Sequence, residues 1–206
     1  MYGAWLELEN DVSIQTKDFR AMIDSTFETL LTITTILSGV YAAVSFDWFA
    51  SAMMEPHPGE PMSSEMITQA LIGVFLGLIF ILPLTLIVLS WALSKIWAST
   101  TWRTIAWSGL LYCLTQDFTG ILALLAFPLL AANFFVGPIL IAAVLFVIIL
   151  PTTLGISLGY RVSVSYDQDA MPLKKKKRRY ALNATLTVVA ILIIQAILGL
   201  FIITPG

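Results

Sequence analysis

The chain has 206 residues, of which 58% are hydrophobic and only 12% are charged. Soluble domains carry about 25% charged residues, so this composition excludes an ordinary water-soluble domain and predicts an integral membrane protein. The 11 basic and 13 acidic residues nearly cancel, so the net charge of −2 identifies no partner. One cysteine, Cys113, and one histidine, His57, exclude a disulfide framework and a zinc site of ordinary ligand number.

Residues 1–26 are predicted to form a cytoplasmic amphipathic segment. They lack a basic leader followed by an apolar core and a small-residue cleavage site, so we expect them to stay in the mature protein. Their apolar residues recur every three, four or seven positions with acids between them, as in an interfacial helix or a helix packed on a partner. The alternative is a short frayed lead-in to the first span. The apolar residues of this stripe are Trp5, Leu8, Val12, Phe19, Met22 and Ile23.

The rest of the chain, residues 27–206, is predicted to be one transmembrane domain. A bilayer core about 30 Å thick needs about 20 mostly apolar residues per helix, and several apolar runs reach that length. The predicted fold is therefore an all-α polytopic membrane helix bundle. Its five expected spans are residues 27–46, 67–93, 104–127, 137–158 and 181–203.

The basic residues predict the orientation of these spans. All 11 fall before span one, between spans two and three, or between spans four and five. Lys and Arg concentrate in cytoplasmic connections, so this side is predicted to be cytoplasmic, with the N-terminus inside and the C-terminus outside. Trp97, Trp102 and Trp107 cluster around the second of these connections, where we expect them at headgroup depth.

The most concentrated charge lies in the basic cytoplasmic loop predicted at residues 161–180. Six consecutive basic residues there are expected to contact anionic lipid headgroups or a partner, because each one near an anionic leaflet contributes about 1 kcal/mol of attraction. The simpler interpretation is a topology anchor for the fifth span. Nucleic acid is not an expected ligand, because no basic and aromatic surface surrounds the segment. The six residues are Lys174, Lys175, Lys176, Lys177, Arg178 and Arg179.

No sequence motif predicts catalysis. The chain has no serine nucleophile elbow, no zinc-protease helix motif and no glycine-rich phosphate loop. We therefore expect a protein that is not an enzyme and has no cofactor and no metal site.

Asp117 is the candidate site of this sequence, because it interrupts the apolar run LLYCLTQDFTGILALL. An ionisable residue within a span is costly and normally faces protein or water, which makes it a functional candidate. On a helix it shares a stripe of small and polar residues suited to a close helix contact. The polar members are Tyr112 and Gln116, and the expected packing positions are Gly109, Cys113 and Gly120.

No Lys or Arg lies at membrane depth to pair with Asp117, so it is expected to be protonated or bonded to hydroxyl groups. The candidates are Thr152, Thr153 and the threonines of TLLTITT, residues 29–35 in span one. Two interpretations stay open at this point. Asp117 is either a buried hydrogen-bonding link between helices or subunits, or a proton, cation or substrate site.

The stretch LIVLSWALSKIWASTTWRTIAWSGLLYCL, followed later by LGISLGYRVSVS, resembles the bacterial and archaeal branch of the Yip family. The resemblance covers spans two to five. It implies five spans, a cytoplasmic N-terminus and a non-enzymatic role in membrane organisation or trafficking through partners.

The sequence therefore predicts an interaction or accessory subunit, or a membrane-organising protein, within a larger membrane assembly. Other membrane protein subunits and anionic lipids are its expected partners. The alternative is a small transporter or a proton or cation pathway that uses Asp117. A water-accessible cavity at the middle of the membrane would favour the transporter, and a dry Asp117 bonded across an interface would favour the accessory subunit.

Overall fold

The structure is a computed structural model, and it describes the backbone of residues 2–53, 64–131, 136–166 and 174–203. Side chains are described for residues 18–45, 78–126, 142–166 and 177–199. His57 lies outside the described residues, as do the side chains of the predicted stripe before Asp18.

Five helices make up the described chain, which confirms the predicted all-α bundle. The first, α1, is unbroken through the predicted boundary at residue 26, so the N-terminal segment and the first span are one helix. The predicted basic loop 161–180 is also partly helical, because one helix continues to Tyr166 and the next begins at Lys174. The helices are α1 (Tyr2–Met53), α2 (Ser64–Ile96), α3 (Thr100–Ala131), α4 (Val136–Tyr166) and α5 (Lys174–Ile203).

Each helix contains a segment long and apolar enough to cross a membrane, as the sequence predicts. A helix satisfies its backbone hydrogen bonds internally. This is required in the hydrocarbon core of a bilayer, because no water is present there to bond the backbone N–H and C=O groups. Many Ser and Thr hydroxyls in these segments also donate to the carbonyl one turn earlier in their own helix, for example Thr34 to Leu30 at 2.7 Å. The candidate spans are Asp18–Ser45, Leu78–Ile96, Thr100–Ala126, Ala142–Tyr166 and Lys177–Gly199.

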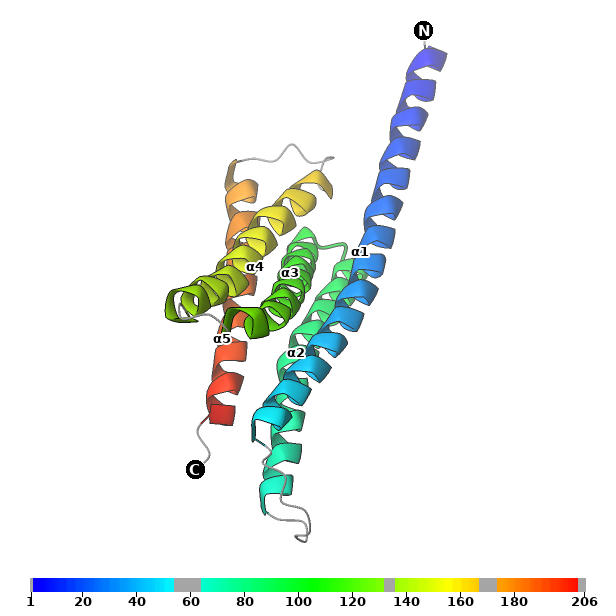
Figure 1. Ribbon diagram of the computed structural model, residues 1–206. Helices are drawn as coiled ribbons and strands as arrows, with labels where there is room; N and C mark the ends of the chain where they lie inside the picture. The colour runs from blue at the N-terminus through cyan, green and yellow to red at the C-terminus, as the bar shows by residue number, and fades with distance from the viewer. Residues whose placement is uncertain (1, 54–63, 132–135, 167–173, 204–206) are drawn as a thin grey trace.

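Helix α3 is the centre of the bundle and packs against all four other helices (Figure 1). Its candidate span buries 39% of its most hydrophobic stretch inside the protein, against 17% for those of α1, α4 and α5. The hydrophobic core accordingly forms around α3. Its most deeply buried members include Phe27, Ile87, Ala106, Leu110 and Val188.

A short turn sets α3 beside α2. The amide of Ser99 donates to the carbonyl of Ser94 at 3.2 Å, and Ala98 has a φ of 46°. This hydrogen bond and left-handed residue end a helix in the Schellman manner, although glycine is the usual residue at such a φ. The turn reverses the chain so that α2 and α3 run antiparallel (Figure 1).

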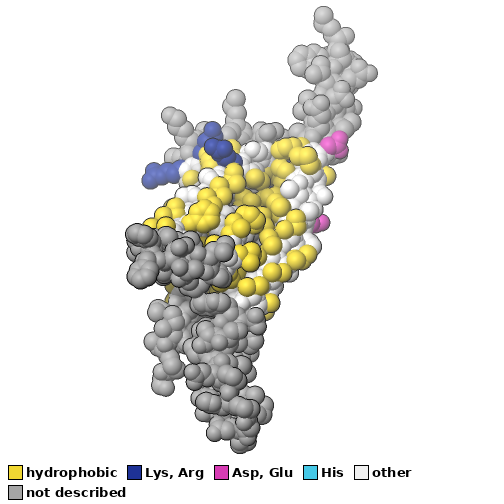
Figure 2. Space-filling model, in the orientation of Figure 1, with side chains coloured by type: hydrophobic (Ala, Val, Ile, Leu, Met, Phe, Trp, Pro, Cys, Tyr) yellow, Lys and Arg dark blue, Asp and Glu magenta, His cyan; other side chains and the backbone are white. Residues whose placement is uncertain are grey.

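One end of the bundle, here called the basic end, carries the described Lys and Arg side chains. It comprises Arg20 of α1, Lys95, Arg103, Arg161 and the start of α5 at Lys177–Arg179. Figure 2 shows Lys and Arg gathered toward one end of the visible face, with hydrophobic side chains over the part below. Large apolar residues are exposed on all five helices, as expected of a protein surrounded by lipid.

At the same end, α1 extends beyond the other four helices (Figure 1). The helix has 52 residues and is roughly 80 Å long at 1.5 Å per residue, far more than a bilayer core needs. The part that precedes the candidate span at Asp18 therefore projects from the bundle.

Candidate functional site

Asp117 lies inside the bundle on the face of α3 that meets α1. Only 2% of the residue is exposed, and the hydroxyl of Ser38 donates to its Oδ2 atom. Ser38 is also buried and follows the threonine-rich stretch of span one by one turn. The intramembrane acid is thus bonded to a hydroxyl of α1, and this bond ties α1 to α3.

The threonines that the sequence offered as partners are directed elsewhere. Thr152 donates to the carbonyl of Ile148 at 2.6 Å, and Thr153 donates to that of Leu150 at 3.0 Å, so both bond within α4. The threonine hydroxyls of residues 29–35 likewise donate to carbonyls of α1. A β-branched hydroxyl in a helix readily reaches such a carbonyl, which leaves fewer hydroxyls for contacts between helices.

Gln116, next to Asp117, belongs to a second set of hydrogen bonds that joins α3 to α5. The amide of Gln195 donates from Nε2 to Oε1 of Gln116 at 3.0 Å, and the hydroxyl of Tyr112 donates to Oε1 of Gln195 at 3.1 Å. Sequence reasoning missed Gln195, although an amide within the apolar run AILIIQAILG is a signal of the same kind as Gln116. We call Ser38, Tyr112, Gln116, Asp117 and Gln195 the polar layer.

The three predicted packing residues of α3 each meet a different surface. A Cβ built on Gly120 would lie 2.8 Å from the ring of Tyr41 in α1. One built on Gly109 would lie 2.9 Å from Ile87 of α2 and 3.4 Å from Ile191 of α5. Cys113 is buried in the hydrophobic core. The stripe therefore packs α3 against several helices rather than against one.

A close contact between α3 and two glycines of α4 was not predicted. Gly155 and Gly159 of α4 face Ser108 and Tyr112, and a Cβ on Gly159 would lie 2.6 Å from the Cα of Ser108. The sequence GISLG carries the signal, since small residues four positions apart allow two helix backbones to approach.

A second polar cluster, the basic-end cluster, surrounds Arg103 of α3. The guanidinium carbon lies 3.5 Å from the ring centroid of Tyr166 and 5.6 Å from that of Trp91. Its Nη2 atom lies 3.9 Å from Oδ1 of Asp24. Only 7% of Arg103 is exposed. The sequence marked Arg103 only as a topology signal, whereas the structure makes it a buried member of the bundle.

Aromatic residues pack beside this cluster. Phe27 stacks on Trp91 with ring centroids 3.8 Å apart and meets Trp107 edge-on at 5.1 Å. Trp107 is 3% exposed and belongs to the core, so its indole packs inside the bundle, and its headgroup depth stays a prediction. Trp97 is exposed and its ring lies 6.4 Å from that of Trp102.

The basic segment begins helix α5. Lys177, Arg178 and Arg179 are exposed, and the side chains of Lys174 to Lys176 lie outside the described residues. Elsewhere on the basic end, Lys95 is paired with Glu28 at 2.8 Å. Exposed pairs of this kind add little to stability.

Comparisons with protein families, with characterised proteins and with solved structures give no match to this chain. The resemblance to the Yip family therefore stays a prediction from the sequence. What the structure does establish is an integral membrane architecture of five apolar helices, with polar side chains bonded to one another inside it.

Proposed function

We propose that this protein is a non-enzymatic accessory or membrane-organising subunit of a larger membrane assembly. The observation that carries the proposal is the projecting part of α1, which leaves the bundle at the basic end (Figure 1). The part of α1 before Asp18 extends past the other described helices, and the sequence predicts an apolar stripe on it that a helix of another subunit could cover.

The state of Asp117 supports the same proposal. It is buried and bonded to Ser38, as expected of a link between helices, and hydrogen bonds of this kind hold membrane helices together.

The apolar stripe of the N-terminal segment provides the main test. Replacing Trp5, Leu8 and Val12 together by Gln should release partner subunits, so the complex extracted in mild detergent should lose mass in native mass spectrometry. The matched control replaces Glu7, Asn10 and Ile14 by Gln. These three positions lie on the opposite side of a helix with about 3.6 residues per turn. A parent protein that is extracted as the 22.7 kDa chain alone would contradict the proposal.

A transporter or a proton or cation pathway is the second candidate. The observation in its favour is that Asp117 and Gln116 are consecutive, so the two sets of hydrogen bonds in the polar layer lie side by side within the membrane. Polar side chains at membrane depth commonly mark such pathways.

Two substitutions of Asp117 separate the candidates. If Asp117 is a structural link, the Asp117→Asn variant should assemble nearly normally. The Asp117→Leu variant should lose about 0.6 kcal/mol of assembly free energy, and at most about 1.7 kcal/mol. As a proton or cation site, the carboxyl group itself is required, so Asn should abolish flux in reconstituted vesicles although assembly is intact. Flux that is present in the parent and absent from Asp117→Asn would overturn the accessory-subunit proposal.

The orientation that accompanies this proposal has a cytoplasmic N-terminus and an outside C-terminus. It is supported by the distribution of all 11 basic residues on one side of the five spans. A reporter fused after Gly206 should read as external, and a cytoplasmic reading would reverse the orientation.

At the cytoplasmic face, the six basic residues Lys174 to Arg179 contact anionic headgroups. Replacing all six by Gln should weaken binding of the protein to anionic bilayers, by less than the sum of six separate contributions because neighbouring charges repel and are screened. If binding to anionic bilayers is unchanged, the basic segment does not have this role.

A further inference from the structure

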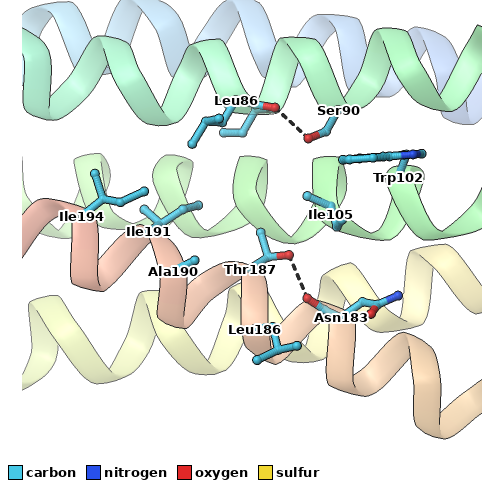
Figure 3. A pocket seen from close by; sticks show the side chains of 11 residues that line it. Leu86, Ser90, Trp102, Ile105, Asn183, Leu186, Thr187, Ala190, Ile191 and Ile194 are labelled. Atoms are coloured by element: carbon cyan, nitrogen blue, oxygen red, sulfur yellow. Dashed lines mark hydrogen bonds between the residues drawn. The ribbon is translucent and has the colours of Figure 1, made fainter.

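A groove with a volume of about 350 Å³ runs along the bundle between α2, α3 and α5 (Figure 3). Its floor is formed by Ile87 and Ile191, which are buried over Gly109 of α3. Leu86 and Leu186 line it and are exposed, so the groove opens toward the surroundings of the bundle. In a membrane protein those surroundings are lipid chains.

The length of the groove matches one leaflet. Along α5 it reaches from Asn183 to Ile194, which is roughly 16 Å at 1.5 Å per residue. Half of a hydrocarbon core of about 30 Å is about 15 Å. An acyl chain that enters at Asn183 and ends near Ile194 would therefore span its own leaflet within the groove.

The inside of the groove is apolar because its hydroxyls are directed back to their own helices. Ser90 donates to the carbonyl of Leu86 and Thr187 donates to that of Asn183, each at 2.7 Å (Figure 3). No residue that lines the groove is charged. These features suit a hydrocarbon chain better than a polar solute.

The side-chain nitrogen atoms of the groove lie at one end. Figure 3 shows the nitrogen atoms of Asn183 and Trp102 at the end of the groove where α5 begins. The Nδ2 atom of Asn183 is buried and has no hydrogen-bond partner among the described residues. A turn about the terminal bond exchanges the amide nitrogen with the amide oxygen, so this side chain has a donor available for a phosphate or ester oxygen. Tryptophan is also frequent at headgroup depth.

The charge at this end favours an anion. Arg179 is exposed and lies one helical turn before Asn183, so the two residues share a face of α5. Arg178 is also exposed but lies about 150° around the helix from the centre of the groove-lining residues. A headgroup above the groove would meet Arg179 and not Arg178.

We propose that the α2–α3–α5 groove binds one anionic phospholipid of the basic-end leaflet, with an acyl chain over Ile87 and Ile191 and the phosphate between Asn183 and Arg179. This proposal rests on the proposed contact of the basic segment with anionic lipids. It locates one such contact at the end of the groove, beside Asn183 and Arg179. It differs from a diffuse attraction because only one of two adjacent arginines takes part.

The experiment titrates the purified full-length protein in mild detergent with phosphatidylglycerol and, separately, with phosphatidylcholine of the same chains. Native mass spectrometry measures the dissociation constant of the first bound lipid. We expect tighter binding of phosphatidylglycerol in the parent, about fivefold weaker binding in Arg179→Gln, and parent-like binding in Arg178→Gln. Added inorganic phosphate should not displace the lipid, because the chain contributes to binding.

A second pair of variants tests the apolar part. Ala190→Phe fills the groove, and Ala196→Phe makes the same change at an exposed position on the opposite side of α5. Only Ala190→Phe should abolish the first binding event. Parent-like binding in Ala190→Phe would overturn the groove proposal. Equal losses in Arg178→Gln and Arg179→Gln would also overturn it, but they would leave the diffuse contact of the basic segment with anionic lipids intact. Parent-like binding after replacement of all six basic residues would overturn both proposals.

Discussion

The two halves of α3 hold their polar residues in different ways. Near its start, the charge of Arg103 is buried between the rings of Trp91 and Tyr166, close to Asp24. Further along, Gln116 and Asp117 are hydrogen-bonded to uncharged side chains of other helices, namely Gln195 and Ser38. The first half relies on charge and aromatic faces, and the second half relies on hydrogen bonds between side chains.

The two halves also differ in how completely their polar atoms are used. Among the described residues, the buried side-chain atoms without a hydrogen bond include Nε of Arg103 and the indole nitrogens of Trp91 and Trp107, and none from the polar layer. A full set of hydrogen bonds is needed where neither water nor headgroups are available. The basic end, where the described Lys and Arg side chains gather, is the end of the bundle expected to lie nearer the membrane surface.

The largest effect is expected from Arg103→Leu. It removes the cation from the faces of Tyr166 and Trp91 and leaves the buried Oδ1 of Asp24 without its counter-ion. We expect a loss of about 3 kcal/mol, the lower end for breaking a buried pair, because the Asp24 side chain keeps 30% of its surface exposed. Thermal unfolding in mild detergent measures this.

Two companions make the result specific. Arg103→Lys keeps the charge but loses the planar group that lies over the rings, so its stability should fall between parent and Arg103→Leu. Adding Asp24→Asn to Arg103→Leu should recover part of the loss, because no unpaired acid remains. A double variant as unstable as the sum of the single variants would show that the ion pair is not the cause.

Gly159→Ala is expected to have the next largest effect. Gly159 packs on Ser108, which lies on α3 between the two clusters, and the added Cβ would meet backbone that cannot move aside. We expect a net loss of about 2 kcal/mol from overpacking, despite the better helix propensity of Ala.

The matched control is Gly199→Ala on α5, where no atom of the described residues lies within 4 Å of the added atom. Its unfolding temperature should be unchanged or slightly raised. Equal effects at the two glycines would mean that the close approach of α3 and α4 does not support either half.

The number and type of helices could be predicted from the sequence, because membrane length and backbone hydrogen bonding leave few alternatives to an apolar helix. Asp117 could be found for the same reason, since an acid within an apolar run is conspicuous. Its partner Ser38 could not, because many Ser and Thr residues lie in the spans and only three-dimensional register selects one that is 79 positions away.

The burial of Arg103 was missed for a different reason. Basic residues near span ends are ordinarily topology signals, and composition does not show that the rings of Trp91 and Tyr166 enclose this one. Gln195 and the GISLG spacing, by contrast, are visible in the sequence, because an amide and two glycines four positions apart are conspicuous within apolar spans.

The smallest effect is expected from Gln195→Leu in the polar layer. The substitution removes the acceptor of the Tyr112 hydroxyl and the donor to Gln116, so two groups lose their partners. Intramembrane hydrogen bonds average about 0.6 kcal/mol, because polar groups of separated membrane helices also find partners, so we expect a loss of about 1 kcal/mol. Ile193→Leu, at an exposed position of the same helix, should unfold like the parent. A double-mutant cycle with Tyr112→Phe isolates the bond at 3.1 Å. If Gln195→Leu instead costs as much as Arg103→Leu, the hydrogen-bonded half of α3 is as strongly coupled as the charged half, and the contrast between them fails.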